Sequence, residues 1–137
     1  MTTFESPIKT INKTQEDIFT FLSDFNNFTP LIPADKVEGW RVEGEECYFK
    51  IPNVGDVALK MIEKDLPKTI KIAPAGKVPF DFNFWVQLKS VAPYDTKMKL
   101  TIKADLNMMM KMDAKKPIQN GIDAIADGLA AFLNAQR

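Results

Sequence analysis

The sequence predicts an α+β fold in which a curved antiparallel sheet of about seven strands wraps around a long C-terminal helix. One or two short helices are expected after the first strand. Three observations carry this prediction. Apolar and polar residues alternate in several segments, which is the two-residue period of strands with one buried face. A stripe of apolar residues with helical spacing occupies the C-terminal segment. Prolines occur singly, with no linker or repeat, so one domain is expected over residues 1–137.

The clearest strands are 80–89 and 97–106. In the first strand the apolar residues occupy every second position, and Trp85 is the one apolar residue on the opposite face. The inward row of this strand is Phe80, Phe82, Phe84, Val86 and Leu88. The inward row of the second strand is Met98, Leu100, Ile102, Ala104 and Leu106. Residues 91–95 have turn chemistry, so the two strands are predicted to pair as an antiparallel hairpin.

Five shorter segments complete the predicted sheet. They are 4–11, 37–43, 46–51, 56–61 and 70–72. In 46–51 and 56–61 the inward rows are Cys47, Phe49, Ile51 and Val57, Leu59, Met61. The inward face of 37–43, which contains Trp40, is less clearly marked by its pattern. The order of these strands along the chain predicts a meandering antiparallel sheet.

Helices are predicted at both ends of the chain. Thr14 is a suitable N-cap, with Asp17 three residues on, for a helix whose apolar face is Ile18, Phe21, Leu22 and Phe25. A second short helix is expected to carry Phe28, Leu31 and Ile32 before Pro33. The long C-terminal helix begins near Pro117, and its stripe is Ile118, Ile122, Ile125, Leu129, Phe132 and Leu133. Residues 108–112 form either a separate turn or a kinked extension of that helix.

Composition excludes several classes of chemistry. The chain has no histidine, so catalytic triads, histidine general bases and histidine-ligated zinc cannot form within it. Cys47 is the single cysteine and has no internal disulfide partner. The net charge of zero gives no electrostatic reason to expect nucleic acid or an anionic membrane as a partner. With no signal-peptide pattern and no membrane-length apolar run, we expect a cytoplasmic protein without integral membrane association.

The segment 11–28, INKTQEDIFTFLSDFNNF, resembles the opening of the START-like, helix-grip superfamily of SRPBCC type, which includes polyketide cyclases/dehydrases and lipid-transport proteins. Members run from a first strand into a small polar cap and an apolar helix with a Leu-Ser-Asp-like end. An aromatic-plus-proline continuation follows, here Phe28-Thr29-Pro30. The order of elements resembles the superfamily over essentially the whole chain. The resemblance implies a hydrophobic ligand cavity; it implies no particular reaction, because one fold serves many functions.

A curved sheet around a helix that does not fill its concavity leaves a pocket, so we expect a ligand site between the sheet and the C-terminal helix. The expected lining is Phe49, Leu59, Phe80, Phe82, Phe84, Leu100, Ile102, Met108, Met112, Ile118, Ile122 and Ile125. Arg41 is the candidate polar anchor, since its guanidinium could hold a ligand carboxylate; the alternative is a solvated strand residue. The phenylalanine row is either an aromatic wall or simply core, and the methionines form either an adaptable pocket mouth or a loosely packed helix start.

For the other candidate residues, a structural role is weighed against a functional one. Trp85 marks either a homodimer contact or an indole covered by lysine and glutamine side chains from neighbouring strands. Glu43, Glu45 and Glu46 around Gly44 read as a solvated turn, because their spacing is not that of a metal loop. Cys47 reads as an inert core thiol. No metal, cofactor or catalytic residue is expected.

The leading functional prediction is binding of a small hydrophobic or amphipathic molecule, such as a lipid, without catalysis. One alternative is a cyclase- or hydrolase-like enzyme of the same superfamily that uses carboxylates, lysine or tyrosine. The other is a protein-interaction module with a filled core. The inward rows carry almost no ionisable side chains, and this favours binding over catalysis.

Overall fold

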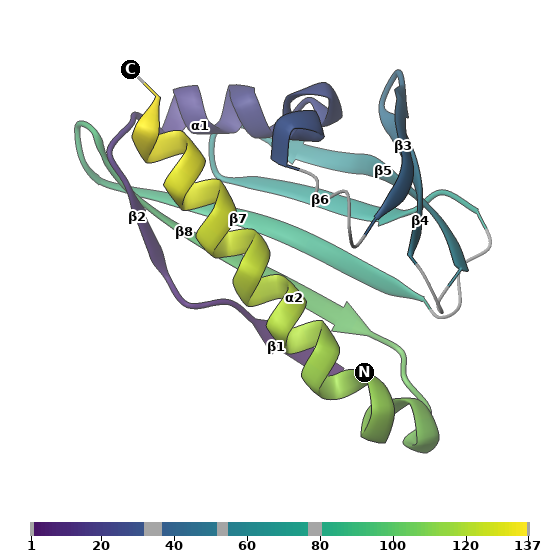
Figure 1. Ribbon diagram of the computed structural model, residues 1–137. Helices are drawn as coiled ribbons and strands as arrows, with labels where there is room; N and C mark the ends of the chain where they lie inside the picture. The colour runs from purple at the N-terminus through teal and green to yellow at the C-terminus, as the bar shows by residue number, and fades with distance from the viewer. Residues whose placement is uncertain (1, 32–36, 52–54, 77–80, 137) are drawn as a thin grey trace.

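The computed structural model describes residues 2–31, 37–51, 55–76 and 81–136. Its elements confirm the predicted α+β fold, with a curved antiparallel sheet, short helices after the first strands and a long C-terminal helix (Figure 1). In chain order the elements are β1 (Thr2–Glu5), β2 (Lys9–Ile11), α1 (Gln15–Leu22), the 3₁₀ helix η1 (Phe25–Leu31), β3 (Glu38–Glu43), β4 (Glu46–Ile51), β5 (Gly55–Asp65), β6 (Thr69–Pro74), β7 (Phe82–Ala92), β8 (Asp95–Ala104) and α2 (Met108–Ala135).

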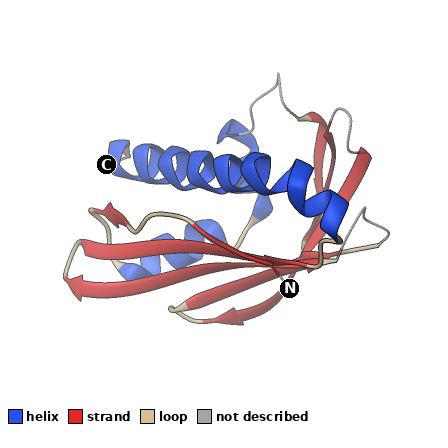
Figure 2. Ribbon diagram, turned by 90° about the horizontal axis from the view of Figure 1, so that it is seen from below, coloured by secondary structure: helices blue, strands red, loops and turns tan. Residues whose placement is uncertain are grey.

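The strands form one sheet in the order β1-β8-β7-β6-β5-β4-β3, and β2 also pairs with β8. Helix α2 forms a separate layer on one side of the sheet, and β3 and β4 turn up toward the level of that helix (Figure 2). Helix α2 contacts β1, β2 and β8, whereas α1 contacts β6 and β7. The face that the helices cover is called the concave face here, and the opposite face is called the convex face.

The predicted first strand, 4–11, is two strands, so the described residues form a sheet of eight strands rather than about seven. The break lies at Pro7, which has no backbone N–H to donate to the β8 ladder. Ser6 replaces part of the lost pairing. Its N–H donates to the carbonyl of Leu100, and its Oγ accepts from the N–H of Leu100 at 2.9 Å. β1 therefore pairs with the end of β8, and β2 pairs with its beginning.

A second irregularity lies in β5. Met61 pairs with Ile72, but Glu63 pairs with Lys71, so β5 contains one extra residue at Ile62. Because successive strand residues point to opposite faces, this bulge reverses the facing of every residue that follows. Glu63 then lies opposite Lys71 on the convex face, and Lys64 takes an inward position.

The short helices follow the predicted signals. Thr14 caps α1, and its Oγ1 accepts from the N–H of Asp17 at 3.1 Å. Phe25 belongs to η1 rather than to α1, and its ring meets that of Phe28 edge to face. The predicted positions of Ile32 and Pro33 lie outside the described residues.

Residues 108–112 are an extension of the C-terminal helix rather than a separate turn, because α2 runs from Met108 through Pro117 without a break. Proline lacks the N–H that would bond to the carbonyl four residues earlier, yet the helix continues past it. The fully buried face of α2 includes Ile122, Ala126, Leu129 and Leu133, which lie one turn apart. Within the part of the chain that the structure describes, no helix is both long enough and apolar enough to cross a bilayer.

Candidate functional site

The concave face has two ends that differ in how completely their side chains are buried. At the end beneath α1 and the C-terminal half of α2, large apolar side chains are between 0% and 1% exposed. We call this set the sealed end: Ile11, Ile18, Leu22, Ile70, Val86, Met98, Leu100, Ile122 and Leu133. These side chains form the core that holds the sheet and both helices together.

At the other end, inward apolar side chains pack against the core but remain only partly buried. We call this set the aromatic end: Phe28, Leu31, Trp40, Val42, Phe49, Leu59, Phe82, Phe84, Ile102 and Ile118. Its members come from η1, from strands β3, β4, β5, β7 and β8, and from α2. Strand registers bring members of the set together: Phe84 lies opposite Ile102, and Val42 and Leu59 lie on either side of the buried Cys47.

Trp40 lies within the aromatic end with its polar atom already paired. Its indole N–H donates to Oγ1 of Thr29, in η1, at 3.0 Å. Its ring lies 5.8 Å from the ring of Phe49 with an interplanar angle of 33°. This contact joins edge strand β3 to β4, and the hydrogen bond joins β3 to η1. The indole is therefore fixed while part of its surface stays accessible.

Ionisable side chains at the described inward positions of the strands are few, and each is neutral or paired. Lys9 lies opposite Met98 and forms an ion pair with Asp127 of α2. Lys64 lies opposite Ile70, and its Nζ is 2.8 Å from a carboxylate oxygen of Glu45. Burial raises the pKa of the Cys47 thiol to about 12, so this group is neutral at physiological pH, in agreement with an inert core thiol.

The predicted lining residues do not all lie together: some lie at the aromatic end and others at the sealed end. Phe49, Leu59, Phe82, Phe84, Ile102 and Ile118 all lie in the aromatic end. Leu100 and Ile122 belong instead to the sealed end, where neighbouring side chains cover them completely. Phe80 lies outside the described residues, as do the side chains of Met108 and Met112.

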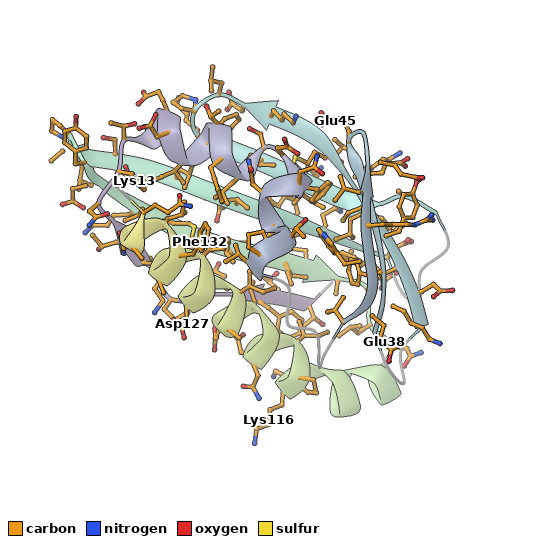
Figure 3. All side chains as sticks on the ribbon, turned by 45° about the horizontal axis from the view of Figure 1, so that its top comes forward. Lys13, Glu38, Glu45, Lys116, Asp127 and Phe132 are labelled. Carbon is orange, nitrogen blue, oxygen red and sulfur yellow. The ribbon has the colours of Figure 1, made fainter. Side chains whose placement is uncertain are left out.

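Ile125 does not face the core, contrary to its expected place in the lining, and is 48% exposed. It lies one turn from Ile122 and two turns from Phe132, whose ring is 5.7 Å from that of Phe21 in α1. Figure 3 shows Phe132 on the side of α2 that faces α1, with Asp127 away from it. Ile125 therefore lies on the flank of α2 toward α1, because apolar spacing alone does not separate the centre of a helix face from its margin.

Arg41 lies on the convex face, opposite to the face that the Phe49 side chain occupies. It pairs with Tyr48, which is one residue before Phe49 and points to the opposite side of the sheet. The guanidinium carbon lies 4.5 Å from the centre of the Tyr48 ring, and its nearest carboxylate among the described residues is Glu43 at 3.9 Å. Arg41 is thus an exposed convex-face residue, and its role as a polar anchor stays a prediction.

A cleft of about 400 Å³ lies beside Arg41 at the β3–β4–β5 end of the sheet. Its lining also includes Glu38, Gly39, Tyr48, Phe49, Lys50, Asp56, Val57, Ala58, Ala75 and Gly76. Lys50 pairs across the strands with both Glu38 and Asp56, so the charges of this cleft have opposite charges as neighbours. The hydroxyl of Tyr48 donates to Glu46 at 2.9 Å, and this bond raises the pKa of Tyr48. Sequence patterning did not predict this cleft.

Trp85 agrees with one of its two predicted interpretations. The ammonium groups of Lys71 and Lys103 lie 5.4 and 5.7 Å from the centre of its ring system. Side chains from β6 and β8 therefore cover the indole on the convex face. The described residues contain no cluster of three or more cysteine, aspartate or glutamate side chains that could hold a metal ion.

The sequence analysis missed Trp40, Val42, Phe28 and Leu31 as members of the site. Trp40 and Val42 do alternate with charged neighbours, so the signal was present. The 3₁₀ helix η1 has no comparable signal, because its apolar positions follow neither the strand period nor the helix period over so short a length.

No protein-family model matches the chain, and no curated protein matches it. Solved structures do match its fold. Norcoclaurine synthase from Thalictrum flavum, in complex with dopamine and hydroxybenzaldehyde, gives a TM-score of 0.80 at 12% identity over 99% of this chain and 88% of that one. A START superfamily protein from Mycobacterium smegmatis gives 0.74 at 12% identity over 96% of both chains. A protein from Thermus thermophilus gives 0.69 at 14% identity over 98% of both.

These likenesses extend over nearly the whole chain and agree with the strand order and the covering helix described above. At such low identity they show the fold and nothing finer. The chain has the START-like helix-grip fold.

Proposed function

We propose that this protein binds a small hydrophobic or amphipathic molecule at the aromatic end of the concave face, between the sheet and α2, without catalysing a reaction. The observation that carries the proposal is the incomplete burial of the inward aromatic and aliphatic side chains at this end. Apolar surface left in contact with water is stabilised when a ligand covers it. The sealed end offers no comparable surface, since its side chains are already covered.

The fold supports this proposal from a second direction. The superfamily that segment 11–28 resembles includes lipid-transport proteins, and the matched norcoclaurine synthase holds dopamine and hydroxybenzaldehyde. That neighbour is an enzyme by name, so an enzyme of the same superfamily is the second candidate function. Catalysis would require an ionisable group beside the ligand, and the two lysines at described inward strand positions, Lys9 and Lys64, lie at the sealed end and are paired.

The partners follow from the same features. We expect binding to occur in the cytosol, with the small molecule as the main partner and no role for nucleic acid. A homodimer through the convex face would have to displace the lysines that cover Trp85. An interaction module with a filled core is disfavoured by the incompletely covered side chains of the aromatic end.

The direct test is native mass spectrometry of the gently purified protein, followed by organic extraction of any retained molecule. We expect a retained small molecule in the wild type. Leu59→Trp, which adds bulk at the aromatic end, should abolish the retention. Lys60→Gln is the matched control, because it is the next residue on the same strand and points to the convex face. Retention that is unchanged in Leu59→Trp, with the fold intact by circular dichroism, would contradict the proposal.

A further inference from the structure

The cleft beside Arg41 is a second candidate site, and its charged lining residues lie on the convex face. Its volume of about 400 Å³ is within the range of pockets that hold small molecules. Four of its lining residues, Gly39, Ala58, Ala75 and Gly76, have at most a methyl side chain and so take up little of its space. Its described lining includes two cations and two anions, whose places on the sheet decide what the cleft can hold.

One row of lining residues crosses three strands and carries a single positive charge. Arg41 of β3 lies opposite Tyr48 of β4, which in turn lies opposite Ala58 of β5. The Tyr48 ring is held at two points, because the guanidinium carbon lies 4.5 Å from its centre and its hydroxyl donates to Glu46. A guanidinium can bind a carboxylate through two of its N–H groups. The contact of Arg41 with Glu43, at 3.9 Å, leaves donors for such a ligand.

The neighbouring row carries a net negative charge. Lys50 of β4 lies opposite Glu38 of β3 on one side and opposite Asp56 of β5 on the other. Within the described part of the chain, none of these three side chains takes part in an ion pair. The two carboxylates can therefore accept from a ligand cation. Because Lys50 lies two residues after Tyr48 on β4, the two rows are about 7 Å apart.

A molecule that carries both a carboxylate and an ammonium group matches this pattern of charge. Its carboxylate can face Arg41 while its ammonium faces Asp56, and an apolar group can pack against the Tyr48 ring. A ligand with only a negative charge meets the two acids of the second row, and a ligand with only a positive charge meets Arg41.

We infer that the cleft binds a small zwitterion with an apolar group, of the kind that an aromatic amino acid represents. This site is separate from the one in the proposed function, because its charged groups lie on the opposite face of the sheet. It gives Arg41 the role of carboxylate anchor, with Asp56 as the partner of the ammonium group.

Three probes of matched size separate the two charges: phenylalanine, phenylpropanoate and phenylethylammonium. At neutral pH the first is a zwitterion, the second carries only the carboxylate and the third carries only the ammonium. Affinities are measured by isothermal titration calorimetry on the full chain. We expect phenylalanine to bind at least about tenfold more tightly than either singly charged probe.

The position of the bound molecule is read from an assigned proton–nitrogen correlation spectrum. Phenylalanine should shift the backbone amide resonances of Ala58 and Ala75, which line the cleft. It should leave the indole resonance of Trp40 unchanged, because that side chain packs in the aromatic end.

Two variants remove one charge each. Arg41→Gln should weaken the binding of phenylalanine and phenylpropanoate by about tenfold without weakening that of phenylethylammonium. Asp56→Asn should weaken the binding of phenylalanine and phenylethylammonium without weakening that of phenylpropanoate. Lys60→Gln is the matched control, because it removes a convex-face charge on β5 that does not line the cleft, and it should leave all three affinities unchanged.

An affinity for either singly charged probe within about threefold of that for phenylalanine would overturn the inference, as would phenylalanine binding that neither Arg41→Gln nor Asp56→Asn weakens. Phenylalanine that shifts Trp40 rather than Ala58 and Ala75 would also overturn it, and would support the aromatic end as the binding site. The retention experiment tests the aromatic end by itself, so the two proposals can fail independently.

Discussion

The sealed end and the aromatic end share strands β7 and β8, yet their side chains have different degrees of burial. At the sealed end, α1 contributes Ile18 and Leu22 and α2 contributes Ile122 and Leu133, so helices fill the concavity from two sides. At the aromatic end the described cover consists of the short η1 and Ile118 of α2. Full burial of a large aliphatic side chain contributes about 1.5–3 kcal/mol, and partial burial contributes less.

The difference teaches where stability and function can be separated in this fold. Apolar surface that is already covered stabilises the protein but can do nothing for a ligand. Surface that is partly covered contributes less to folding and can contribute to binding. Strand β7 spans both conditions, because Phe84 lies in the aromatic end and Val86, two residues later on the same face, lies in the sealed end.

The largest expected effect compares Leu100→Ala with Leu59→Ala. Leu100 is fully buried, so its truncation should lower the free energy of unfolding by about 2–5 kcal/mol. Leu59 is partly buried, and its truncation should cost about 1–2 kcal/mol, because less surface is lost and the space left can be hydrated. Urea denaturation of both variants measures the difference. Equal costs would mean that the two ends are equally sealed.

A second prediction separates binding from stability on β7. Phe84→Ala should weaken the binding of naphthylmethanol, a small hydrophobic probe for the aromatic end, by about tenfold, through loss of a ring contact and of apolar area. Val86→Ala should lower stability and leave the affinity of the folded protein unchanged, because Val86 faces the closed core. Calorimetric titration at a temperature where both variants remain folded makes the comparison. The opposite ranking of affinities would place the ligand elsewhere.

A third, smaller effect concerns the helix that closes the sealed end. Thr14→Ala removes the side-chain oxygen that accepts from the N–H of Asp17, and should lower stability by about 1 kcal/mol. Thr14→Ser keeps the hydroxyl and should restore most of that loss. Thermal and urea denaturation of the pair, together with an unchanged affinity for naphthylmethanol, would show that this cap supports only the sealed end.

The smallest effect is expected at Cys47, which is fully buried between the two ends. Its pKa of about 12 lies above the ordinary value of 9.0, so the folded state favours the neutral thiol. The stabilising effect is complete below pH 9.0 and is lost only as the pH rises toward 12. Iodoacetamide at neutral pH should therefore leave the native protein unmodified while it alkylates the urea-unfolded chain. Rapid alkylation of the native protein would mean that solvent reaches past the aromatic end.

Much of the fold could be predicted from local pattern. The alternation in 80–89 and 97–106 predicted the β7–β8 hairpin, and Thr14 with Asp17 predicted the start of α1. The failures lie where one residue changes the facing of its neighbours. Ile62 forms a bulge that brings Lys64 inward, and Pro7 divides the first strand. Neither the bulge nor the strand break can be recognised from residue types alone, because each depends on how the strand pairs with its neighbour.

The candidate site could be predicted in part, because strand alternation shows which side chains face inward. Strand alternation placed Phe49, Leu59, Phe82, Phe84 and Ile102 on the concave face. It could not distinguish Leu100, which is sealed, from Ile102, which is partly exposed two residues later. That distinction depends on what covers each side chain, and the covering elements, α1, η1 and α2, are far from β8 in the sequence.

By itself, the sequence determined the α+β class, the absence of histidine chemistry and the nearly uncharged character of the inward strand face, because these follow from residue types and a two-residue period. Only the tertiary structure decided that Arg41 lies on the convex face, that Lys9 and Lys64 are paired at the sealed end, and that the described side chains of the aromatic end remain incompletely covered. The physical reason is that burial and ion pairing are properties of contacts between distant segments, and a local pattern contains no information about the segment on the other side.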